Sequence, residues 1–126
     1  MALIPTLTIK DATTFSDELN FSVSDSLSVT APAQGLSLVN VANSATEVIY
    51  ADSGSAGTAF VYIRNANTAN SYSVDIQTDN GNTVYGTLDN GEFAFIPIDT
   101  NEGVQVTASG GTVAIEYAYW TKAKNK

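Results

Sequence analysis

The sequence predicts an all-β fold: an antiparallel β-sandwich of jelly-roll or immunoglobulin-like type, with an extended N-terminal arm or hairpin. Two observations favour this class. From about residue 46 onward, apolar and polar residues alternate with a period of two, as they do in half-buried strands. Clusters of Gly, Asn and Asp interrupt the alternation about every 6–12 residues, a spacing typical of the short strands and turns of sandwiches. The 3.6-residue period of amphipathic helices is almost absent.

The clearest strand is residues 71–78, in which every second side chain from Tyr72 to Ile76 is predicted to face the core. The segments 79–82 and 89–91 both contain Asn-Gly, a pair that tolerates the positive φ angles of tight turns. They are therefore expected to connect neighbouring strands. Further strands are expected at residues 47–50, 58–64, 84–85, 93–98, 104–108 and 112–120.

The chain divides into three segments. Residues 36–121 are expected to form the sandwich, and 122–126 a basic C-terminal tail. Residues 1–35 differ, because their apolar side chains alternate with Ser, Asn and Asp too thinly to form a core of their own; 31–35 reads as a linker. Two interpretations of this first segment stay open: a hairpin or edge strands of the same domain, and an arm that becomes ordered on a neighbouring subunit.

The chain contains no histidine and no cysteine. This composition excludes catalytic Ser-His-Asp and Cys-His arrangements, disulfide bonds, and the usual zinc, copper and haem sites, all of which need one of these residues. The lack of cysteine also fits synthesis in a cytosol. We therefore expect a protein that is not an enzyme and uses no cofactor and no metal.

Carboxylates offer the remaining route to chemistry, since glycoside hydrolysis needs only two of them. Glu92, Asp99 and Glu116 are the candidates, but most acids of this chain fall in turns or at outward positions of strands. The segment 75–79 has alternating oxygen-bearing side chains, as calcium loops do, yet it lacks the glycine and the closing acid of an EF-hand. No catalytic or metal-binding residue is assigned from these patterns.

The net charge of −8 is unevenly distributed. Three of the five basic residues are Lys122, Lys124 and Lys126, so residues 1–121 carry two basic and thirteen acidic side chains. A body this acidic repels phosphate backbones, which predicts that nucleic acid is not a partner. No run of about 20 apolar residues is present, so no membrane partner is expected either.

Aromatic side chains and the single arginine mark a candidate interface. In the strand 58–64, alternation places Phe60, Tyr62 and Arg64 on one face, and the sole tryptophan, Trp120, shares a face with charged residues of the last strand. Aromatic residues and Arg are enriched in interface hot spots. The same side chains would also suit a sugar-stacking platform, or would simply cover the chain's own arm. The interface candidates in the arm are Phe15, Leu19 and Phe21.

Two segments of the second half carry a resemblance. Residues 90–98 contain the pattern G-x-F-x-x-I-P, and residues 103–117 contain V-x-A-S-G-G-T-x-x-I-E-Y. Both resemble small all-β accessory proteins in the virions of tailed bacteriophages. The resemblance implies a capsid decoration, or cement, protein: a homo-oligomer, for instance a trimer, that binds the major capsid protein or other virion proteins. The alternatives are a tail- or fibre-associated adhesin and a carbohydrate-binding module, for which a glycan would be the partner.

Overall fold

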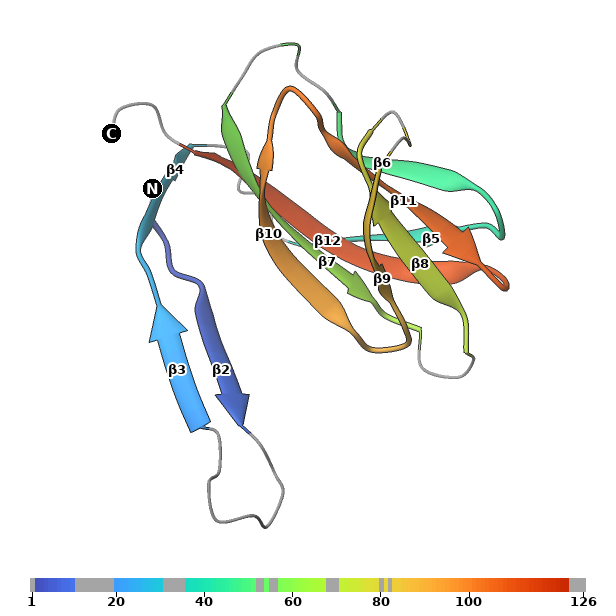
Figure 1. The fold of residues 1–126 in the computed structure, drawn as a ribbon, viewed down its shortest axis with the longest axis horizontal. Helices are drawn as coiled ribbons and strands as arrows, with labels where there is room; N and C mark the ends of the chain where they lie inside the picture. The colour runs from blue at the N-terminus through green and yellow to red at the C-terminus, as the bar shows by residue number, and fades with distance from the viewer. Residues whose placement is uncertain are drawn as a thin grey trace.

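The computed structural model describes residues 2–10, 20–30, 36–51, 54, 57–67, 71–79, 81 and 83–122. Every regular element in these ranges is a β-strand, and two facing sheets form the body of the molecule (Figure 1). The strands are β1 (Ala2–Leu3), β2 (Thr6–Lys10), β3 (Asn20–Ser24), β4 (Leu27–Thr30), β5 (Ser37–Val41), β6 (Thr46–Tyr50), β7 (Thr58–Asn65), β8 (Ser73–Gln77), β9 (Val84–Leu88), β10 (Phe93–Asp99), β11 (Val104–Ser109) and β12 (Val113–Lys122).

The two sheets have the strand order of a jelly roll. One sheet runs β6–β11–β8–β9, and the other contains β5–β12–β7–β10, with antiparallel pairing throughout. From β5 to β12, each strand lies in the opposite sheet from the one before, except for the β8–β9 hairpin. The predicted all-β sandwich is thus confirmed, with the jelly-roll arrangement of the two that the sequence left open.

The core lies between the sheets and is built from alternate positions of the central strands. In β7 and β12, the side chains of Val61, Ile63, Val113 and Ile115 are completely buried. They face the equally buried aliphatic residues of β8 and β11 in the other sheet. The predicted inward face of residues 71–78 is confirmed, since Val74 and Ile76 are buried and Tyr72 packs against this cluster.

Turn chemistry fixes the β8–β9 and β9–β10 connections. Gly81 and Gly91 adopt φ angles of 77° and 79°, in the left-handed region where a side chain would be strained. The Gly81 N–H donates to the carbonyl of Thr78, at 2.8 Å, and the Glu92 N–H to that of Asp89, at 3.0 Å. Both connections were expected from their Asn-Gly pairs.

One buried amide joins three parts of the sandwich. Asn65, at the end of β7, is completely buried. Its Nδ2 donates to the carbonyls of Tyr72, at 3.2 Å, and Leu88, at 3.0 Å, while its Oδ1 accepts the N–H of Asn67, at 3.1 Å. This side chain therefore ties β7, in one sheet, to the start of β8 and the end of β9, in the other.

The N-terminal segment forms both edge strands and a hairpin, as the first of the two interpretations expected. Strands β1 and β4 are edge strands, because β4 pairs with the last two residues of β12 and β1 pairs with β4. Strands β2 and β3 form a separate two-stranded hairpin that projects from the sandwich (Figure 1). The linker at 31–35, the candidates Phe15 and Leu19, and residues 123–126 of the tail lie outside the described residues.

Candidate interaction surface

The outer face of the sheet that contains β7, β10 and β12 gathers the aromatic residues singled out in the sequence. The register pairs Trp120 with Phe60, Ala118 with Tyr62, and Glu116 with Arg64 across β12 and β7. Because paired residues of neighbouring strands point to the same side of a sheet, all four candidates from the sandwich share this face. Alternation predicted the outward position within each strand, whereas the pairing of β7 with β12 that brings the four side chains together comes from the structure.

Two phenylalanines of β10 extend this face, and the sequence interpretation missed them. Phe95 is paired with Tyr62, and Phe93 with Arg64. The Phe95 ring stacks on Phe60 with a centroid distance of 6.1 Å and an interplanar angle of 6°, and it lies 6.5 Å from the Trp120 ring. Phe60 is only 8% exposed, whereas Phe95 is 37% and Phe93 60% exposed. The surface that another molecule would touch is therefore made by Phe93 and Phe95, with Phe60 beneath them.

A polar group borders the aromatic residues. The Tyr62 hydroxyl donates to Glu116 Oε1 at 2.9 Å, and Arg64 Nη1 lies 4.0 Å from the same oxygen. Burial, followed by the hydrogen bond to Glu116 and the negative charge of that residue, raises the pKa of Tyr62, while the nearby Arg64 opposes the shift. An ion pair this long and this exposed contributes at most about 1 kcal/mol, so the main effect of Glu116 is to orient the tyrosine.

The β2–β3 hairpin has one apolar and one polar face. The register pairs Leu7 with Val23 and Ile9 with Phe21, and alternation puts these four side chains on one side. On the other side, the Thr8 hydroxyl donates to Ser22 Oγ at 3.1 Å. The four apolar side chains are between 39% and 55% exposed, although a core strand would bury such residues. We call Leu7, Ile9, Phe21 and Val23 the hairpin face.

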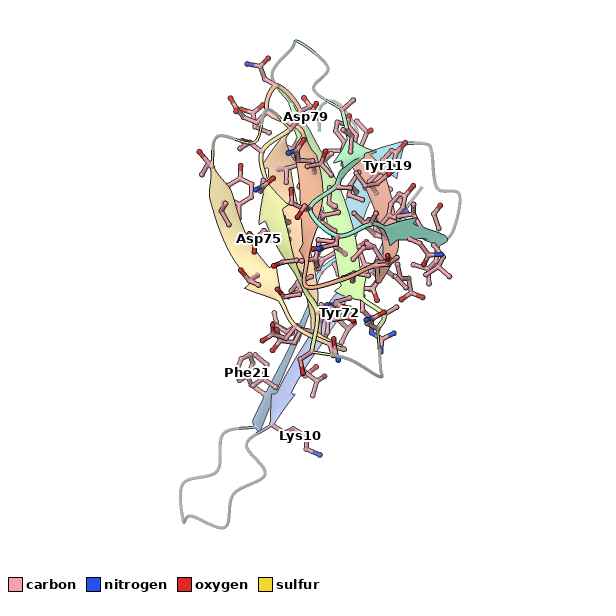
Figure 2. The ribbon with its side chains drawn as sticks, turned by 90° about the vertical axis from the view of Figure 1, so that its right-hand side faces the viewer. Lys10, Phe21, Tyr72, Asp75, Asp79 and Tyr119 are labelled. Atoms are coloured by element: carbon pink, nitrogen blue, oxygen red, sulfur yellow. The ribbon has the colours of Figure 1, made fainter. Side chains whose placement is uncertain are left out.

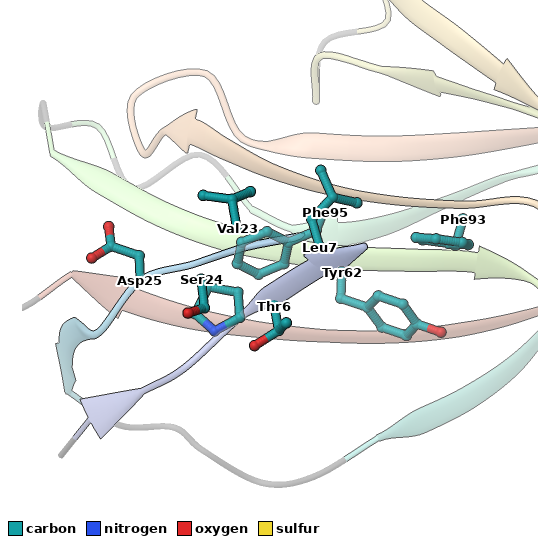
Figure 3. Close-up of a pocket in the computed structure, with 9 residues that line it drawn as sticks. Thr6, Leu7, Val23, Ser24, Asp25, Tyr62, Phe93 and Phe95 are labelled. Carbon is teal, nitrogen blue, oxygen red and sulfur yellow. The ribbon is translucent and has the colours of Figure 1, made fainter. Parts of the chain in front are cut away.

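An apolar groove of about 400 Å³ separates the root of the hairpin from the outer face of the sandwich (Figure 3). Leu7 and Val23 line it from the hairpin, and Tyr62, Phe93 and Phe95 line it from the sheet. The remaining lining residues are Pro5, Thr6, Ser24 and Asp25. The outer pair of the hairpin face, Ile9 and Phe21, does not line the groove.

The carboxylates considered for catalysis lie apart. Glu92 and Asp99 flank opposite ends of β10, which spans roughly 20 Å at the rise of a strand. Glu92 Oε1 accepts the N–H of Asp89 at 2.8 Å, and Asp99 Oδ1 accepts the N–H of Asn101 at 2.9 Å, so both stabilise turns. Glu116 is engaged by Tyr62, as described above.

The segment 75–79 was considered as a calcium loop. Asp75 Oδ1 accepts the Thr87 hydroxyl at 2.8 Å, and Gln77 Oε1 accepts both Gln105 Nε2 at 3.0 Å and the Thr107 hydroxyl at 2.9 Å. These oxygens bind neighbouring strands of their own sheet (Figure 2 shows Asp75 on β8). Within the part of the chain that the structure describes, no three acidic residues come close enough together to hold a metal ion.

Comparisons with known proteins show no family and only distant structural likenesses. No family model matches the chain, and no curated protein matches it. Among solved structures, it is similar to the Yersinia pseudotuberculosis-derived mitogen, at a TM-score of 0.39 and 11% identity, over 73% of this chain and 87% of that one. It is also similar to Bacillus endospore appendages, described as a family of disulfide-linked pili, at a TM-score of 0.39 and 14% identity, over 71% and 87% of the two chains. Neither likeness is close enough to carry an argument about function. In the described ranges, no helix is long and apolar enough to cross a membrane.

Proposed function

We propose that this chain is a non-enzymatic structural protein of a virus particle, a capsid decoration or cement protein that binds the assembled particle as a homo-oligomer. The resemblance of residues 90–98 and 103–117 to phage virion proteins motivates the proposal. Such a protein acts through buried area repeated on a symmetric lattice, so that many modest contacts give a firm attachment.

The hairpin face is the observation that carries the proposal. A two-stranded hairpin is at best marginally stable in water, and this one exposes four large apolar side chains. Exposed apolar clusters of this kind on a folded protein mark interaction sites. Exposure of these side chains to water is unfavourable in the isolated chain, and binding to a particle would bury them. A particle-binding protein would use a segment of this kind.

A second candidate function rests on the half-exposed aromatic rings. On the outer face, Phe95 lies 6.5 Å from the Trp120 ring and two residues along β10 from Phe93, and exposed rings of this kind stack on sugars in carbohydrate-binding proteins. A tail- or fibre-associated adhesin, or a carbohydrate-binding module, would use them. Trp120 gives a direct readout of this alternative, because its fluorescence should shift when an oligosaccharide binds nearby.

The proposal is tested on purified virus particles. Antibodies raised against the isolated chain should label particles from cultures that carry its gene, with gold particles distributed over the capsid. Mass spectrometry of the same particles should detect the chain in many copies per capsid. Labelling confined to the tail, together with a Trp120 response on a glycan panel, would favour the adhesin. Particles that lack the chain altogether would contradict both virion roles.

A further inference from the structure

The described residues of the chain cover the hairpin face only in part. Both hairpin strands start from the edge of the sandwich, where β1 pairs with β4 and the Asp25 N–H donates to the Pro5 carbonyl at 3.2 Å. From this root the hairpin points away from the body, and Figure 2 shows Phe21 and Lys10 beyond the end of the sandwich. Only the pair nearest the root, Leu7 and Val23, reaches the groove. Among the described residues, the outer pair lies outside the groove, and Ile9 and Phe21 stay 39% and 42% exposed.

The groove, in contrast to the hairpin face, is an open apolar space that a second molecule could fill. Its wall on the sandwich exposes Phe93 and Phe95, and its other wall is the root of the hairpin face. Of the polar side chains that line it, Thr6, Ser24 and Asp25 come from the hairpin strands or from the residue that follows them, and Tyr62 comes from the sandwich. A filling molecule would therefore meet the rings of Phe93, Phe95 and Tyr62 on the sandwich side and a few small polar groups at the root. An amphipathic two-stranded segment fits that description.

We propose that the hairpin of a second copy of this chain fills the groove, so that Ile9 and Phe21 of one copy pack against Phe93 and Phe95 of the other. This inference deepens the proposed function by naming the partner of the hairpin. If two copies exchange hairpins reciprocally, the hairpin face and the groove of both copies become buried. Because this arrangement has twofold symmetry, no unfilled groove remains to recruit a further copy.

The areas involved suit a self-association. The hairpin face, Phe93 and Phe95 together leave on the order of 500 Å² of apolar surface in water per chain, when a large side chain contributes about 150–250 Å². Two reciprocal contacts would then bury about 1,000 Å², the smallest area expected of a specific interface. The two hairpin strands carry one charged side chain, Lys10, so packing them on an acidic neighbour brings few like charges together.

The chemistry of the hairpin face argues against a sugar or a nucleic acid as its occupant. Its four side chains are Leu, Ile, Phe and Val, which have no hydrogen-bond donor or acceptor. Ligands rich in hydroxyl or phosphate groups would lose their hydration there and gain no replacement bonds. An apolar protein surface suffers no such penalty.

Cross-linking in the full-length protein tests the contact directly. Because the chain has no cysteine, one introduced thiol per chain reports on one position. A Phe21→Cys chain mixed with a size-tagged Phe93→Cys chain should form a mixed dimer with a short bismaleimide cross-linker. The matched control is Ser22→Cys, one residue further along β3 on the polar face, which should give at least tenfold less mixed dimer with the same partner.

The energetic test uses light scattering and sedimentation. The unaltered chain should be an oligomer in solution, and Ile9→Ser with Phe21→Ser should weaken its self-association about 100-fold or more, as loss of two hot-spot side chains does. Val84→Ser, which removes an equally exposed apolar residue from β9, should leave the oligomer intact. Circular dichroism checks that each variant keeps its β-structure.

A monomeric unaltered chain at tens of micromolar would overturn the inference, and so would mixed dimers of equal yield from the Phe21 and Ser22 positions. Cross-linking of Phe21→Cys only with itself would also overturn it, because the hairpins would then pack on each other rather than in the groove. These outcomes are independent of the proposed function. An exchanged oligomer that is absent from virus particles would refute the virion role alone, and a monomer that decorates capsids would refute the exchange alone.

Discussion

Replacement of the buried amide of Asn65 should be among the most destabilising single changes in the sandwich. In Asn65→Ala, the carbonyls of Tyr72 and Leu88 each lose their donor, and the Asn67 N–H loses its acceptor. A lost hydrogen bond costs about 1 kcal/mol net, and a buried carbonyl left without a partner costs about 1–3 kcal/mol. Because the Leu88 carbonyl is buried and that of Tyr72 is partly buried, we expect a total loss of about 3–5 kcal/mol in the free energy of unfolding.

Equilibrium unfolding in urea measures this loss. With a denaturant dependence of about 1.5–2 kcal/mol per M for a domain of this size, the midpoint should fall by roughly 2 M. The matched control is Asn40→Ala on β5, where the residue is exposed, and its effect should stay within about 0.5 kcal/mol. An Asn65→Ala cost below about 1 kcal/mol would refute the argument that this amide joins the two sheets.

The variant Asn65→Asp separates the loss of donors from the loss of volume. Aspartate is nearly the same size but has no N–H, and as a carboxylate it would face two carbonyl oxygens. Burial there should raise the pKa of the new carboxyl above its unfolded value of about 3.9. The variant is then most stable below that pH and loses stability as the pH rises through the raised pKa. The same substitution at exposed Asn40 should show little of this pH dependence.

Three further predictions concern other parts of the molecule. A Cβ on Gly111 would overlap the Tyr72 ring, so Gly111→Ala should cost about 1–3 kcal/mol in urea unfolding, whereas Gly86→Ala, with open space around it, should be neutral. Because the pKa of Tyr62 is raised, its contribution to stability is complete below about pH 10 and is lost as the pH rises through the raised pKa. Tyr62→Phe should remove a step above pH 10 from the absorbance titration of tyrosine at 295 nm, and loss of a step at or below pH 10 would contradict this. Replacing residues 5–25 by Asn-Gly should join β1 to β4 by a tight turn and leave a folded sandwich, checked by circular dichroism; an unfolded product would show that the hairpin is needed for folding.

The strands of the sandwich were largely predictable because burial on one side imposes a period of two. This holds best for β8, where the inward Val74 and Ile76 are buried and the outward Ser73, Asp75 and Gln77 are polar. Strand β5 was missed. Its exposed Leu38 and its half-buried Val39 are both apolar, so the alternation is blurred where the strand lies at the sheet edge.

The candidate surface was predictable only in part, for a similar reason. In β10, Phe93 and Phe95 alternate with Ala94, Ile96 and Ile98, so both faces of the strand are apolar. Periodicity cannot tell the inward from the outward face in such a strand; its register on β7 decides it, because Ala94 and Ile96 pair with inward residues of β7. The role of Asn65 was not predictable from the sequence either. An asparagine at the end of a strand is typical of a turn, and its hydrogen bond to the Leu88 carbonyl depends on how distant strands pack.

The central position of β12 has a consequence for how the protein is made. This strand, the last of the chain, pairs with β7 on one side and with β5 and then β4 on the other. During synthesis, the sheet therefore lacks its middle strand until all the strands that precede β12 in the chain have been made, and folding must wait for these long-range pairings. Since β4, which follows the N-terminal hairpin, pairs with residues 121–122 of β12, the hairpin is held at the sandwich only once β12 is in place. The order of synthesis thus delays the positioning of the hairpin until the sandwich is complete.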